Sequence, residues 1–100
     1  MATSTQHGLP IAEVHPRMRA RVAGRVSAVT YRPESRNPQL RARLTDSSGS
    51  LDLVFHGRRE IAGITPGRQL IATGTVYEEN GDIVIFDPEY RLLPSGSLDL

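Results

Sequence analysis

The chain has 100 residues, which is enough for one small domain with a single core. It contains no cysteine, which excludes disulfides, thiolate metal sites and a thiol nucleophile. It also contains no lysine, so arginine supplies all 12 basic side chains against 11 acidic ones. Residues 1–59 hold ten arginines against four acidic residues, whereas residues 60–100 hold two against seven. The near-neutral total therefore does not exclude a polyanionic partner, because local charge attracts such a partner.

The first predicted element is a long strand. Residues 1–8 are small and polar and predict a disordered tail, residues 94–100 predict a flexible tail, and the domain spans residues 9–93. From Met18 to Thr30, small or apolar residues fill the even positions, and the odd positions carry Arg19, Arg21, Arg25 and Ser27, as in a half-buried strand. Gly24, in the middle, indicates a bend or a close backbone approach at a barrel corner.

Two shorter strands follow, joined by a tight turn. Residues 39–45 and 50–56 both alternate apolar and polar side chains. If Thr45 pairs with Ser50, every apolar residue on one strand faces an apolar residue on the other. This match predicts the register of the two strands, because a shift by one residue would turn the apolar side chains outward.

A short helix is predicted next. Residues 57–64 lose the alternation, and Ile61 and Ile64 lie three positions apart, as on one face of a helix. Pro66 and Gly67 would end it.

The last part of the domain predicts a hairpin. Residues 68–77 alternate again, and Asn80-Gly81 is a strong hairpin signal because both turn residues need positive φ. Residues 82–86 form the fifth strand, and Pro88 interrupts pairing after it. This order of three strands, a helix and a hairpin predicts an all-β, five-stranded Greek-key OB-fold barrel with a short helix between strands 3 and 4. The alternative is a five-stranded SH3-like barrel.

The arginines predict a surface for nucleic acid. Guanidinium groups contact phosphates in bidentate fashion, and strand periodicity places many of the arginines on one side of each strand. The alternative is a solvated outer face of the barrel. The predicted contacts on the first two strands are Arg19, Arg21, Arg25, Arg41 and Arg43. Arg43 is the weakest of them, because the predicted register sets it opposite Asp52, which would neutralise its charge.

Further contacts are predicted at the ends of the strands and in the loops. They are Tyr31, Arg32, Arg36, His56, Arg58 and Arg59. Tyr31 is the one aromatic residue predicted on the outward phase where it can stack a base. There are alternatives to nucleic-acid contact at these positions. The loop with Arg32 and Arg36 can be a simple linker, and Arg58 and Arg59 can belong to a surface turn. With so few outward aromatics, binding is expected to depend on phosphates, to be sensitive to salt and to be weakly sequence-selective.

The hairpin offers a second surface. Its register sets Tyr77 against Val84 and Thr75 against Phe86 on the outward phase. An apolar outer patch of this kind is typical of a protein interface. Its predicted members are Ile71, Tyr77, Val84 and Phe86, unless the terminal segments cover them. The alternative function is therefore protein interaction or self-association.

Several chemistries find no support in the sequence. The three histidines have no metal-like spacing, which predicts no metal site, and no cofactor is expected. Without lysine there is no P-loop, and no Gly-x-Ser-x-Gly elbow occurs, so no enzyme is predicted. The first residues lack a basic stretch followed by an apolar one, so we expect a cytoplasmic protein without membrane contact.

Short motifs occur in a fixed order along residues 9–93. They are VAGRV at 22–26, LTDSSGSL at 44–51, LVFHGRR at 53–59, PGR at 66–68, TGTV at 73–76 and DPEY at 87–90. In this order they resemble the OB-fold nucleic-acid-binding family, most closely the wedge-type OB domain of RecG-like branched-DNA helicases. The chain looks like a free-standing OB domain of the actinobacterial kind, without the helicase motor. The resemblance implies non-catalytic binding of single-stranded or branched DNA, or of RNA, in DNA repair or recombination.

Overall fold

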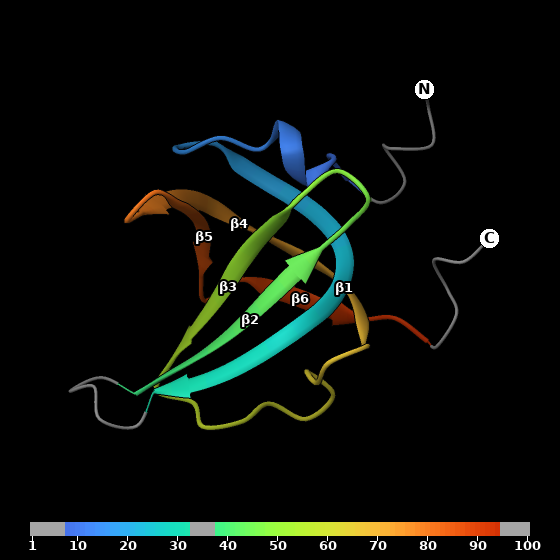
Figure 1. The fold of residues 1–100 in the computed structure, drawn as a ribbon, viewed down its shortest axis with the longest axis vertical. Helices are drawn as coiled ribbons and strands as arrows, with labels where there is room; N and C mark the ends of the chain where they lie inside the picture. The colour runs from blue at the N-terminus through green and yellow to red at the C-terminus, as the bar shows by residue number, and fades with distance from the viewer. Residues whose placement is uncertain (1–7, 33–37, 95–100) are drawn as a thin grey trace.

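The computed structural model describes residues 8–32 and 38–94, and it forms a closed barrel (Figure 1). Its elements are a single 3-10 turn η1 (Ile11–Glu13) and the strands β1 (Arg19–Arg32), β2 (Gln39–Thr45), β3 (Ser50–His56), β4 (Gln69–Glu79), β5 (Asp82–Phe86) and β6 (Glu89–Leu92). The strands follow the order β1-β2-β3-β5-β4, and β4 returns to pair with β1. Among the strand pairs of the described residues, β3 and β5 alone run parallel. The predicted all-β OB-fold barrel is confirmed. Of the two predicted tails, all but Gly8 and Pro94 lie outside the described residues.

The predicted register of β2 and β3 is confirmed. Thr45 pairs with Ser50, Leu44 with Leu51, and the apolar match continues along both strands. Leu44, Leu51 and Leu53 are almost completely buried inside the barrel. Each buried leucine contributes about 1.5–3 kcal/mol relative to an exposed one, so this apolar match is a main determinant of the barrel.

The helix predicted for residues 57–64 does not form. This segment consists of turns, in one of which the Ile64 amide donates a hydrogen bond to the Ile61 carbonyl at 3.0 Å. Gly57 and Gly63 have φ values of 74° and 87°, and a right-handed helix needs negative φ throughout. Both isoleucines still pack into the core, 5 % and 3 % exposed. Among residues 8–32 and 38–94, no helix reaches the length and apolarity that a membrane crossing needs.

The first strand bends at Gly24 and belongs to both halves of the barrel. Its residues 19–25 pair with β4, and its residues 25–32 pair with β2. A Cβ atom at Gly24 would lie 2.6 Å from the Thr45 carbonyl oxygen, so the two backbones approach as closely as predicted. The bend turns the outer surfaces of the two halves in different directions (Figure 1).

A β-bulge follows the bend. The pairing passes from Val26 opposite Leu44 to Ala28 opposite Arg43, which leaves Ser27 as an extra residue. One extra residue reverses the alternation of the strand beyond it. Tyr31 therefore lies on the inward phase and packs against the core. The outward orientation predicted for Tyr31 is wrong for this reason.

Asp46 connects the β2–β3 turn to the N-terminal segment. Its carboxylate accepts hydrogen bonds from the Ser48 amide and hydroxyl, the Gly49 amide and the Ile11 amide, at 2.6–3.0 Å. Partial burial by itself would raise the pKa of Asp46, but these hydrogen bonds outweigh it and lower the pKa below the ordinary value of 3.8. The ionised carboxylate is thus the form that holds turn and η1 together.

We expect Asp46→Ala to lower the free energy of unfolding by about 1–3 kcal/mol, because the partly buried hydrogen bonds from the Ile11 and Gly49 amides lose a charged acceptor. Urea unfolding measures the loss. Because the folded-state pKa is lowered, the contribution of Asp46 is complete above pH 3.8 and is lost as the pH falls through the folded-state value. The difference between wild type and variant should therefore shrink in acid. Asp82→Ala, at an exposed hairpin position, is the control; an equal loss there would contradict the assignment.

Candidate nucleic-acid interface

The bend in β1 divides the outer surface of the barrel into two faces. We call front face the outward side chains of β2, β3, β5 and residues 76–79 of β4. We call rear face the outward side chains of β6 and of the paired residues 19–25 and 69–75. β2 and β3 lie nearer the viewer than β6 (Figure 1). The single arginine surface that was predicted is thereby divided, with Arg41 and Arg43 on the front face and Arg19, Arg21 and Arg25 on or beside the rear face.

Arg41 is enclosed by carboxylates. Its Nη1 donates to Glu79 Oε1 at 2.9 Å, its Nη2 donates to Asp52 Oδ2 at 3.1 Å, and its side chain is 14 % exposed. Burial by itself would lower the pKa of Arg41, but the hydrogen bonds to Glu79 and Asp52 raise it above its ordinary value. This guanidinium is therefore committed to the protein, where it connects β2 to β3 and β4.

Arg43 is the more accessible of the two front arginines. Its Nε lies 3.4 Å from Asp52 Oδ1, and its side chain is 48 % exposed. The predicted pairing of Arg43 with Asp52 is confirmed. The expectation that this pairing makes Arg43 less available than Arg41 is wrong. Arg41 is also bound by Glu79, which lies on β4, and the predicted register covered only β2 and β3.

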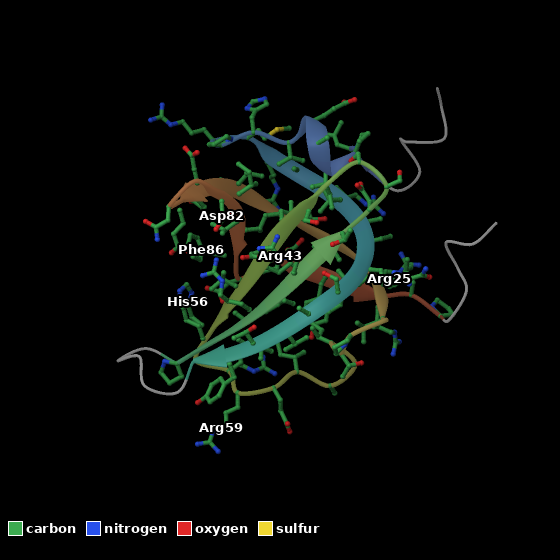
Figure 2. The ribbon with its side chains drawn as sticks, in the orientation of Figure 1. Arg25, Arg43, His56, Arg59, Asp82 and Phe86 are labelled. Carbon is green, nitrogen blue, oxygen red and sulfur yellow. The ribbon has the colours of Figure 1, made fainter. Side chains whose placement is uncertain are left out.

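Three aromatic rings form a row on the front face. Parallel pairing sets β5 beside β3, so that Phe86 lies next to His56 (Figure 2). The two rings stack with centroids 5.4 Å apart and planes at 21°, and Tyr77 follows with its centroid 5.5 Å from that of Phe86. Tyr77 is 47 % exposed. We call these three residues the aromatic row; it joins His56 of β3 to Tyr77 and Phe86, which the sequence placed on the outward phase of the hairpin.

Asp87 fixes one end of the aromatic row. It lies after β5 with a φ of 48°, and its carboxylate accepts hydrogen bonds from the His56 amide and from His56 Nδ1, both at 2.9 Å. Burial by itself would raise the pKa of Asp87, but these bonds from His56 lower it. The imidazole is thereby held over the Phe86 ring, which is the kind of support that a rigid stacking surface needs.

A groove begins at the aromatic row and runs toward the rear face. It has a volume of about 510 Å³, and its walls include His56, Phe86 and Tyr77 on one side and Arg19 and Glu89 on the other. Arg19 Nη2 lies 3.9 Å from Glu89 Oε1, and both side chains are largely exposed. The groove is open to solvent, so it suits an extended ligand that lies along the surface.

Arg58 and Arg59 do not line this groove. Arg58 and Arg59 are exposed in the turns after β3, and Arg59 points away from the barrel where β1, β2 and β3 converge (Figure 2). The backbone of Arg32 ends β1, but its side chain and all of Arg36 lie outside the described residues. Among the described residues, no three His, Asp or Glu side chains gather as a metal site would require.

The predicted apolar patch is not one continuous surface. Ile71 lies on the rear face and Val84 on the front face, and they are 8 % and 0 % exposed. Only Tyr77 and the half-buried Phe86 remain available for contact. These two belong to the aromatic row, so the surface predicted for proteins coincides with the one that can stack bases.

The family follows from residues 20–93, which match the model of the family described as OB-fold nucleic acid binding domain. The chain belongs to this family. The match covers all six strands of the barrel except the first residue of β1. No curated protein matches this OB-fold domain in sequence.

Solved structures share the fold at low sequence identity. The second OB-fold domain of replication protein A from Methanococcus maripaludis has a TM-score of 0.66 and 15 % identity, over 85 % of this chain and 93 % of that one. An OBody bound to hen egg-white lysozyme has a TM-score of 0.59 and 18 % identity, over 84 % and 90 %. The Stn1–Ten1 complex of S. pombe gives 0.62 and 13 %, over 91 % and 68 %. At these identities the similarity establishes the fold alone.

Proposed function

We propose that this OB-fold domain binds single-stranded nucleic acid without catalysis and stacks bases on the aromatic row. The observation that carries the proposal is the stacked His56–Phe86 pair, held by Asp87 and extended by the exposed ring of Tyr77. Base–aromatic stacking contributes about 1–3 kcal/mol per base and tolerates every base. Bases inside a duplex are already stacked, so the row suits unpaired bases, including those at a branch.

Charge on the front face supports stacking over phosphate contact. Asp52 and Glu79 on the front face, together with Asp87 beside it, outnumber Arg41 and Arg43, and Arg41 is bound by two of these carboxylates. A face without surplus cations releases few counterions on binding. We therefore expect binding at the aromatic row to depend weakly on salt, in place of the phosphate-led binding predicted from composition.

The proposed ligand is DNA, and the proposed process is DNA repair or recombination. The motif resemblance to branched-DNA helicases, together with a fold neighbour from a replication protein, supports DNA as the ligand. Repair or recombination in the cytoplasm is the setting that we propose for it. RNA is the alternative, since stacking does not distinguish the two sugars. Comparison of deoxy- and ribo-oligonucleotides of one sequence decides between them.

Fluorescence anisotropy tests the proposal with a single strand of about eight nucleotides, the blunt duplex of that sequence and a fork with single-stranded arms. At moderate salt, where contacts to phosphate alone are weakened, we expect the single strand and the fork to bind and the duplex to bind much more weakly. Equal affinity for all three would refute stacking. No binding to any of them at low salt would refute nucleic-acid binding altogether.

The exposure of Tyr77 beside Phe86 also favours a second candidate, contact with a protein. A structural neighbour with this fold is an OBody that is bound to lysozyme, a protein ligand. If the row joins two copies of the chain, light scattering on the same preparation gives the mass of a dimer, and Phe86→Glu gives that of a monomer. A monomeric wild type excludes self-association.

A further inference from the structure

The rear face carries arginines that no acidic side chain neutralises. Arg21, Arg25 and Arg91 are exposed, and within residues 8–32 and 38–94 none of them forms an ion pair. Glu89 is the one carboxylate among the paired rear residues, and it lies beside Arg19. The rear face therefore has a surplus of positive charge, in contrast to the front face with its surplus of carboxylates.

Strand pairing fixes the spacing of these arginines. Arg21 lies opposite Thr73, Arg91 lies opposite Ile71 on the next row, and Arg25 ends the face. Arg21 and Arg25 are four residues apart on β1, which corresponds to about 13 Å. Over that length, one chain of a nucleic-acid duplex presents about four phosphates. Arg91 comes from β6, two strands away. The three guanidinium groups thus surround a strip in which an extended phosphate backbone can lie.

Apolar side chains form the floor of this strip. Ile71 and Leu93 are 8 % and 9 % exposed, and neither belongs to the core cluster inside the barrel. At the same end, Arg68 Nε donates a hydrogen bond to the Leu93 carbonyl at 3.1 Å, which adds a fourth guanidinium. Tyr90 turns its ring toward Phe55, with centroids 5.7 Å apart and planes at 83°. Tyr90 is nevertheless 38 % exposed and lines the hollow of this face, so the rear face offers cations with a single aromatic ring beside them.

The rear strip continues the groove of the front face. A second hollow, of about 240 Å³, is lined by Arg21, Ile71 and Arg91, and it shares Thr73 and Glu89 with the groove that begins at the aromatic row. The exposed Arg19–Glu89 pair stands at the junction. A strand whose bases stack on the front face therefore has an open path to the rear arginines.

We infer that the rear face is a second contact surface for nucleic acid, where Arg21, Arg25 and Arg91 hold the phosphodiester backbone of a strand that extends beyond the aromatic row. The inference rests on the proposed function for the identity of the ligand. The phosphodiester backbone carries one negative charge per nucleotide at regular spacing. Guanidinium groups suit these phosphates because they contact each one in bidentate fashion. Stacking and charge neutralisation are thereby assigned to opposite faces of one small barrel.

The test compares two oligo-dT probes, of about six and about thirty nucleotides, with wild type and with the triple variant Arg21→Gln/Arg25→Gln/Arg91→Gln. Affinity is measured against salt concentration. With the long probe, we expect the slope of log K against log salt to fall by about two, since each lost phosphate contact removes about 0.7 for a single strand. With the short probe, which covers only the aromatic row, slope and affinity stay unchanged.

Matched variants separate charge from structure. Arg→Lys at the same three positions keeps the charge and should keep the slope. Arg17→Gln removes one charge outside the rear face and should leave both probes unaffected. If the triple variant does not fold, each single Arg→Gln variant should lower the slope for the long probe by about 0.7.

Three results would overturn the inference. The first is a slope for the long probe that remains unchanged in the triple variant. The second is a slope that falls equally for the short probe, which would place these arginines in the front site. Alternatively, poly-glutamate competes with the long probe as well as unlabelled oligo-dT does, which would assign the face to acidic proteins. Failure of the proposed function gives a different result, namely that loss of Phe86 leaves the affinity for the short probe intact.

Discussion

Arg41→Ala lowers the free energy of unfolding by about 2–4 kcal/mol, the largest loss expected from any charged residue of the front face. Asp52 is 8 % exposed and would lose its best hydrogen-bond donor, so a buried carboxylate would keep only the longer contact to Arg43. Glu79 would lose the bond that connects the end of β4 to β2. Urea unfolding at neutral pH measures the loss.

Two variants check this explanation. Arg43→Ala should cost less than about 1 kcal/mol, because its side chain is half-exposed and its ion pair is solvated. Arg41→Met combined with Asp52→Leu should recover much of the stability, since an apolar pair can replace a buried ion pair of similar volume. If Arg41→Ala leaves the unfolding midpoint unchanged, the network does not stabilise the barrel, and Arg41 would be available to a ligand.

Phe86→Ala lowers the affinity for a short single strand by about 10- to 100-fold, which corresponds to the loss of one or two stacked bases. Phe86 is the central ring of the aromatic row and contacts both His56 and Tyr77, so its removal also frees its neighbours. Anisotropy titrations with the probe of about six nucleotides measure the effect. The salt slope should not change, because no phosphate contact is lost.

The controls for Phe86 distinguish a flat ring from apolar volume. Phe86→Leu fills the same space and should lose nearly as much affinity as Phe86→Ala, because an aliphatic side chain cannot stack a base. Tyr31→Leu removes an aromatic ring that packs against the core and should leave affinity unchanged per folded molecule. Wild-type affinity in Phe86→Leu would show that the row acts through hydrophobic contact alone.

The fold was largely predictable because the local patterns agree with it. Alternating leucines predicted the pairing of β2 with β3. Asn80-Gly81 predicted the hairpin, and Gly24 predicted the corner of the barrel. The predicted helix failed where glycines with positive φ interrupt the segment, and two isoleucines three apart occur in turns as well as in helices. Spacing of apolar residues alone does not distinguish these two structures.

The site was less predictable because it depends on closure of the barrel. The bulge at Ser27 left one signal in the sequence, since the apolar residues change from Val26 to Val29 and Tyr31, that is, from even to odd positions. By contrast, the contacts between His56 and Phe86 and between Arg41 and Glu79 join strands that are distant in the chain. Local alternation predicts which side of a strand a residue occupies, but it does not predict its neighbours across a closed sheet.

The last strand, β6, determines how the barrel can meet other polypeptides. It pairs with β4 on one side, is four residues long, follows Pro88, which has no N–H to donate, and carries the charged residues Glu89 and Arg91. Short length, proline and charge are the features by which sheet proteins prevent a foreign strand from adding to an edge. The edge at β6 therefore gives neighbouring copies of the domain little backbone on which to polymerise.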